Sequence, residues 1–153
     1  MNEKPNPFAL RRPSRTIREV TLTDSNQPDI SINFRLRALD VLDGANADSL
    51  SKEYVQKYIT EGLAFPPIDG EIVSLSPEVI LMACTLYYSQ CGEDADKFTV
   101  EELIAFAVTL PEIWQQLIVI CNDLIETGPL GKTLRMVTLP VSPSSDTQKD
   151  IQN

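Results

Sequence analysis

Strict alternation of apolar and polar residues between positions 30 and 37 constrains the fold of this chain more than any other feature. This period is typical of a half-buried strand. The run at 16–23 is rich in β-branched residues, and turn-forming residues occupy positions 24–29. The sequence therefore predicts a β-hairpin over residues 16–37. An isolated hairpin is marginally stable in water, so either helices are expected to cover its apolar face or a partner is expected to cover its edge. The alternating residues are Ile30, Ile32, Phe34 and Leu36 against Ser31, Asn33, Arg35 and Arg37.

Helix signals begin directly after the predicted hairpin. A short apolar patch at 39–42 starts a helical segment that Gly44 weakens. Either Asp48 or Ser49 is expected to cap the next helix. Gly62 is expected just past the end of that helix, because glycine tolerates the left-handed backbone found there.

Three further helices are predicted from their end signals. Ser76, which precedes a proline, is expected to cap a helix that runs to about Gln90 and is apolar on most sides. Thr99 and Glu102 have the spacing of a capping box and open the second helix. Pro111 is expected to end that helix and to begin the last one.

These elements indicate one domain between two polar ends. Residues 1–14 are rich in proline, lack periodicity and are expected to form a flexible arm. Residues 15–128 are expected to form a single globular domain, with the hairpin at 16–37 and helices at 38–126. Residues 129–153 are expected to form a mostly disordered tail. The predicted fold class is mainly α with an N-terminal β-hairpin (α+β), in which a small helical bundle packs on the hairpin.

Charge is distributed unevenly along the chain. Residues 1–37 hold seven basic and four acidic side chains, whereas the remaining residues hold six basic and eighteen acidic ones. An acidic body repels nucleic acid and anionic membrane surfaces, so neither is expected as a partner. It suits a basic protein surface, although acidity also serves solubility alone. No apolar run approaches the roughly 20 residues that span a bilayer.

Residue types that carry chemistry are scarce. The sequence contains no histidine, which is the commonest general base and metal ligand. Cys84, Cys91 and Cys121 lack zinc-site spacing and do not make a disulfide framework, which favours reduced thiols and a cytoplasmic location. The Gly-Lys-Thr at 131–133 lacks the first glycine of a P-loop, because position 126 is glutamate. We therefore expect no enzymatic activity, no cofactor and no metal.

The predicted helices around 79–88 and 113–125 carry a large apolar surface. Part of it could form a groove between helices that holds another polypeptide. The alternative is that the same residues only build the core of the monomer. The candidate protein-binding residues are Ile80, Tyr87, Tyr88, Ile113, Trp114 and Leu117.

The order of elements along the chain has a parallel in a known family. A polar, proline-containing start leads into TIREVTL at 16–22, an acidic turn, ISINFRLRAL at 30–39, helices and a polar tail. This order resembles the tail assembly chaperones of long-tailed bacteriophages, which are small, often acidic, mostly helical cytoplasmic proteins. The resemblance implies a non-enzymatic factor in the host cytoplasm that coats the tape measure protein, keeps it soluble and helps to recruit tail tube protein.

Two other classes stay open at this point. The chain could be a structural component of the virion, such as a tail terminator or a head–tail connector, although those proteins usually carry more strand and form rings. A small enzyme or regulator is the third class, and convergent carboxylates in a deep pocket would favour it. The chaperone hypothesis predicts self-association of the chain or an apolar groove.

Overall fold

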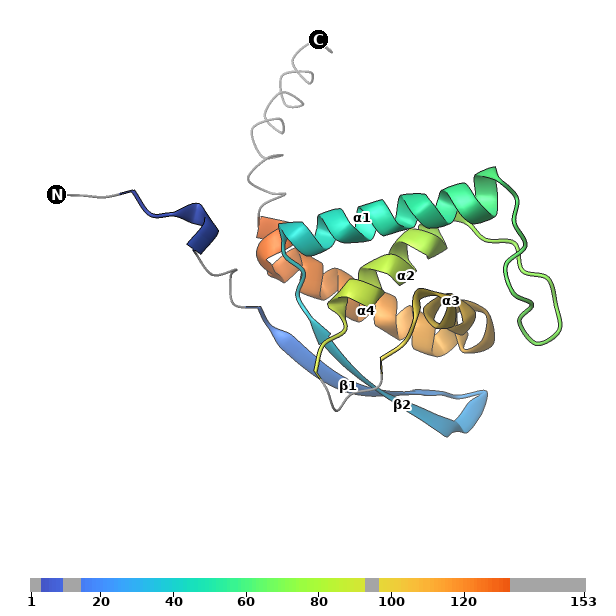
Figure 1. The fold of residues 1–153 in the computed structure, drawn as a ribbon. Coiled ribbons are helices and arrows are strands. Elements are labelled where there is room, and N and C mark those ends of the chain that lie inside the picture. Colours follow the sequence, from blue (N-terminus) through green and yellow to red (C-terminus); the bar gives the residue numbers. More distant parts are fainter. Residues whose placement is uncertain (1–3, 10–14, 93–96, 133–153) are drawn as a thin grey trace, which may run out of the picture.

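The fold begins with the predicted β-hairpin. A computed structural model of the protein describes residues 4–9, 15–92 and 97–132 (Figure 1). The strands β1 (Ile17–Asp24) and β2 (Gln27–Arg37) form a two-stranded antiparallel sheet. The turn between them is shorter than predicted and consists of residues 25 and 26. The Asp24 carboxylate accepts a hydrogen bond of 2.8 Å from the Asn26 amide, which closes this short turn locally.

The first long helix starts earlier than predicted. α1 (Val41–Val55) runs without a break, so the predicted cap at Asp48 or Ser49 is wrong. Its N-cap is Asp40, whose carboxylate accepts a hydrogen bond of 2.9 Å from the Asp43 amide. The Asp43 carboxylate in turn accepts one of 3.5 Å from the Asp40 amide. This reciprocal capping box satisfies amides that a helix start otherwise leaves without partners.

Packing explains why Gly44 does not interrupt α1. A Cβ added at Gly44 would lie 3.1 Å from a methyl carbon of Leu130, so the Leu130 side chain sits directly against the helix. The Leu130 amide also donates a hydrogen bond of 3.0 Å to the Leu39 carbonyl. Residues 129–132 are helical, and the packed part of the chain thus continues past the expected domain end at 128.

The remaining helices follow their end signals. Ser76 caps α2 (Pro77–Ser89) by accepting a hydrogen bond from the Val79 amide, and Thr99 forms the predicted capping box with Glu102. Gly62 adopts the expected left-handed backbone, with a φ of 71°. The elements after α1 are the π-helical turn η2 (Gln56–Thr60), α2 (Pro77–Ser89), α3 (Val100–Thr109) and α4 (Pro111–Thr127).

The helices cover one face of the hairpin, as the alternation predicts. Figure 1 shows α2, α3 and α4 between the hairpin and α1. Phe34 is 1% exposed and lies 5.4 Å from the Phe98 ring and 6.3 Å from the Phe106 ring, measured between centroids. Hairpin and helices therefore share one core, and the fold class is confirmed as mainly α with an N-terminal hairpin.

The ends of the chain lie mostly outside the described residues. The short helix η1 (Pro7–Ala9) is the element found in the expected arm. Residues 1–3, 10–14 and 133–153, which contain most of the predicted arm and tail, are not described.

Two buried thiols give the fold a pH dependence. Cys84 and Cys121 are fully buried, and this burial raises the pKa of each thiol to about 12. An unfolded thiol ionises near pH 8.5, so above that pH the unfolded state binds fewer protons than the native state. The stability that the neutral thiols provide is present below about pH 8.5 and is lost as the pH rises toward 12.

The expected result is a smaller stability difference between the wild type and Cys121→Ala at high pH. Urea unfolding under reducing conditions at about pH 7 and pH 10 measures the free energy of unfolding of both proteins. The difference between the two free energies should be about 2 kcal/mol smaller at pH 10 than at pH 7. Leu124→Ala is the control, because Leu124 is also fully buried on α4 but carries no titratable group, so its stability difference should not change between the two pH values. A pH-independent difference for Cys121→Ala would contradict this assignment.

Candidate functional site

Four of the six predicted binding residues lie inside the monomer. Ile80, Ile113 and Leu117 are fully buried, and Trp114 is 6% exposed. All four belong to the shared core of helices and hairpin. They present no surface to a partner in this fold, which agrees with the alternative that these apolar stripes build the core.

Tyr87 and Tyr88 are the two predicted residues that reach the surface. Tyr87 is 41% exposed and makes an edge-to-face contact with Tyr88, with ring centroids 5.3 Å apart. Both line a hollow of about 370 Å³ that also includes Arg37, Lys97 and Phe98. Arg37 is partly neutralised there, since its guanidinium lies 3.7 Å from the Asp43 carboxylate. The hollow is therefore lined by both charged and aromatic side chains. A binding role for the two tyrosines stays a prediction.

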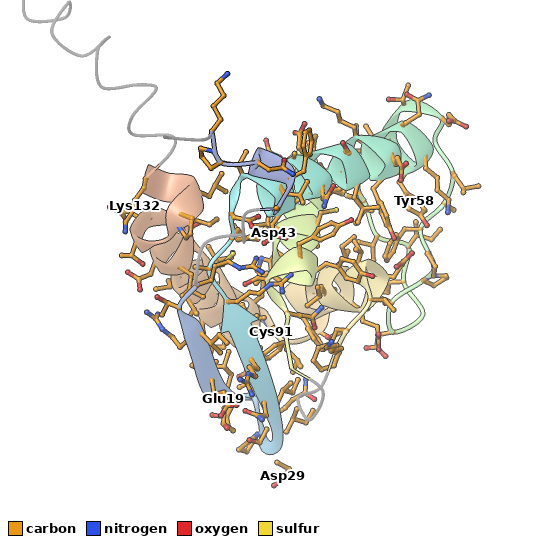
Figure 2. All side chains as sticks on the ribbon, turned by 60° about the vertical axis from the view of Figure 1, so that its left-hand side comes forward. Glu19, Asp29, Asp43, Tyr58, Cys91 and Lys132 are labelled. Atoms are coloured by element: carbon orange, nitrogen blue, oxygen red, sulfur yellow. The ribbon has the colours of Figure 1, made fainter. Side chains whose placement is uncertain are left out.

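A second hollow, lined mostly by apolar residues, lies at the far end of α1, where the sequence predicted no site. It has a volume of about 450 Å³ and lies between η2 and the loop of residues 61–76. Figure 1 shows this loop as the green segment extending beyond the end of α1, and Figure 2 shows Tyr58 there, remote from Asp43 at the helix start. We call this site the loop hollow. Its lining residues are Tyr58, Ile59, Gly62, Leu63, Ala64, Phe65, Ile72, Val73, Ser74 and Leu75.

Three aromatic rings form a row at the loop hollow, and two of them, Tyr58 and Phe65, line it. Tyr58 lies between Tyr54 and Phe65, with centroid distances of 5.9 Å and 5.2 Å. Phe65 is 5% exposed and thus anchors the loop to the core. Tyr54 donates a hydrogen bond of 2.8 Å to Glu101 of α3. Burial, together with this hydrogen bond, raises the pKa of Tyr54, so the phenol remains a neutral donor.

Backbone hydrogen bonds hold the two limbs of the loop together. Ile68 and Glu71 exchange two of them, each 3.0 Å long. Asp69 and Gly70, which lie between them, have left-handed φ angles of 51° and 78° and make the tight turn at the tip. Near η2, the Leu63 amide donates to the Lys57 carbonyl at 3.1 Å. These hydrogen bonds define the path of the loop backbone next to the loop hollow.

Large aliphatic side chains at the loop hollow remain in contact with solvent. Ile59 is 38% exposed, Leu63 is 54% exposed and Ile72 is 87% exposed. Aliphatic residues gathered around one hollow are typical of a surface that another molecule covers. Acidic side chains are frequent in this part of the chain: residues 53–78 contain Glu53, Glu61, Asp69, Glu71 and Glu78 but a single basic residue, Lys57.

The two carboxylates of the α1 capping box are engaged in structural contacts. Asp40 and Asp43 are both buried, and the carboxylate of Asp43 pairs with the Arg15 guanidinium. Within the described ranges, no group of three or more histidine, cysteine or carboxylate side chains is placed to hold a metal ion. Among the helices described, none combines the length and the apolar character needed to cross a membrane.

Comparison with known proteins adds no relative: no protein-family model matches the chain, and neither curated proteins nor solved structures give a match.

Proposed function

We propose that this protein is a non-enzymatic tail assembly chaperone of a long-tailed phage. In this role it binds the tape measure protein in the host cytoplasm, keeps it soluble and assists assembly of the tail tube. The loop hollow, with three exposed aliphatic side chains around it, is the observation that carries the proposal. The order of hairpin, helices and polar tail, which resembles that family, supports the choice of partner.

The geometry of the loop hollow favours an amphipathic helix as its occupant. A helix presents apolar side chains at positions i, i+3, i+4 and i+7, and such a row inserts into an apolar groove. Leu63 and Ile72 stand on the two limbs of the loop, and Ile59 stands on η2. An inserted row of side chains would contact all three of these residues and remove them from water.

Charge further specifies the helix that fits. Glu61, Asp69 and Glu71 are exposed in the loop, and the whole chain has a net charge of −9. A helix with lysine or arginine beside its apolar face complements this surface, and such complementarity speeds association and selects partners. The same negative charge keeps the complex soluble while the apolar face is covered.

Co-expression with the tape measure protein encoded in the same genome tests the proposal. We expect the wild-type chain to keep that protein soluble and to co-purify with it. The double variant Leu63→Asp/Ile72→Asp should weaken the complex by about tenfold or more, because two charges would be buried in the contact. Both residues are largely exposed, so the variant should still fold.

Val41→Asp is the matched control for this experiment. Val41 is 51% exposed and begins α1, at the end remote from the loop hollow, where an acidic residue is tolerated. It should bind like the wild type. A tape measure protein that stays insoluble with the wild-type chain, or a double variant that binds normally, would contradict the proposal. Finding the chain in purified phage particles would indicate a virion structural protein.

A further inference from the structure

The outer edge of β1 presents backbone groups that β2 does not use. The Ala38 amide donates a hydrogen bond of 2.9 Å to the Thr16 carbonyl, and Ile17 is the residue opposite Arg37. Bonded and non-bonded pairs alternate along an antiparallel ladder. Counting from the bonded pair of Thr16 and Ala38, the backbone amides and carbonyls of alternate β1 residues point away from β2. These residues are Ile17, Glu19, Thr21 and Thr23.

The protein covers the corresponding edge of β2. The Arg35 carbonyl accepts a hydrogen bond of 3.0 Å from the Cys91 amide, and the Arg37 carbonyl accepts one of 2.7 Å from the Ser89 hydroxyl. On β1, no described residue supplies such a partner to the outward backbone groups of 17–23. An open strand edge is a template for another strand.

An apolar hollow adjoins this open edge. It has a volume of about 360 Å³ and is lined by Leu22 of β1 together with Gln115, Gln116, Val119 and Ile120 of α4. No residue of β2 lines it, which places it on the outer side of β1. Val119 is 67% exposed, so this part of α4 offers apolar surface next to the unpaired backbone.

We propose that a second copy of this chain pairs its own β1 with this edge. The two β1 strands run antiparallel about a twofold axis at Val20 and join the hairpins into one sheet with the order β2–β1–β1–β2. In this register Glu19 lies opposite Thr21 of the second copy, and Ile17 lies opposite Thr23 of the second copy. Every outward backbone group of one strand then meets an outward group of the other.

The charges of the edge are compatible with self-pairing. No two like charges stand directly opposite each other in this register. Glu19 lies 3.3 Å from the Arg35 guanidinium, and Arg18 lies 2.6 Å from the Asp123 carboxylate, both within one copy. The edge therefore carries locally paired charges despite the net charge of −9. The aliphatic stem of Arg18 of the second copy lies opposite Leu22 and helps to cover the apolar hollow.

Sedimentation of the full chain at increasing concentration tests this inference, which is independent of the proposed function. The wild type should approach twice the monomer mass of 17.0 kDa. Thr21→Pro removes an outward amide at the centre of the contact and leaves the ladder to β2 intact. It should weaken dimerisation by about tenfold or more.

Asn33→Pro is the matched control, because Asn33 lies opposite Thr21 and its amide points to the other edge of the hairpin. This variant should dimerise like the wild type. Val119→Glu tests the apolar hollow separately and should also weaken the dimer. If circular dichroism shows that Thr21→Pro does not fold, the result for Val119→Glu alone tests the inference. A wild type that stays monomeric up to about 100 μM, or a dimer that survives Val119→Glu and a folded Thr21→Pro, would overturn the inference.

Discussion

Replacing Phe34 with alanine should lower the free energy of unfolding by about 3–5 kcal/mol. The Phe34 ring is 1% exposed and contacts Phe98 and Phe106, whose own centroids are 4.9 Å apart. These three rings join the hairpin to the helices. Truncation removes the buried area of one ring and two aromatic contacts, and it leaves a cavity that the surrounding helices fill only in part.

Urea unfolding followed by the fluorescence of Trp114, the single tryptophan, measures the cost of Phe34→Ala. Ile30→Ala is the control on the same strand, because Ile30 is 36% exposed near the tip of the hairpin. Its cost should stay below about 1 kcal/mol. Equal costs for the two variants would show that the hairpin does not depend on the aromatic cluster.

Asp43→Asn should destabilise the protein by about 2–4 kcal/mol. The Asp43 side chain is 4% exposed, pairs with the Arg15 guanidinium and lies 3.7 Å from that of Arg37. The Asp43 carboxylate also accepts a hydrogen bond from the Asp40 amide in the capping box. Asparagine keeps the size and an acceptor but removes the charge. Two arginines at the base of the hairpin then lose the carboxylate that joins them to α1.

Asp48→Asn is the matched control for this prediction. Asp48 also lies on α1, and its carboxylate forms an ion pair of 2.9 Å with the Lys52 ammonium group. The Asp48 side chain is 58% exposed and the Lys52 side chain is 78% exposed. Exposed pairs of this kind contribute little, so the change should cost less than about 0.5 kcal/mol. Thermal and urea unfolding of both variants at neutral pH provide the comparison. Similar costs would contradict a structural role for the buried pair.

Local chemistry explains which elements were predictable from the sequence. The alternation at 30–37 predicts the buried face of β2, and Ser76 and Thr99 cap their helices by contacts that lie within three residues. The predicted cap at Asp48 or Ser49 is wrong because Gly44 weakens the helix signal at 39–44 and so favours a later start. The tolerance of Gly44 depends on Leu130, which packs against it from the other end of the domain. The residues near Gly44 in the sequence therefore do not reveal this contact.

The candidate site was less predictable than the fold. Helical periodicity correctly identifies an apolar stripe at 113–117, but that stripe faces the core. The loop hollow depends on an irregular segment, where the turn at Asp69 and Gly70 places the two limbs side by side. One signal was present in the sequence: Leu63 and Ile72 are large aliphatic residues within a segment rich in turn-forming residues, where no helix or strand buries them.

Hydrogen exchange of the chain with and without its partner tests the central claim most directly. The partner is the soluble tape measure complex or a basic amphipathic helix taken from that protein. Docking at the loop hollow should slow amide exchange in η2 and at residues 61–75, and it should leave the exposed surface of α4 near Val119 unchanged. Protection confined to other parts of the chain, or none at all in a stable complex, would contradict the claim that this hollow holds another polypeptide.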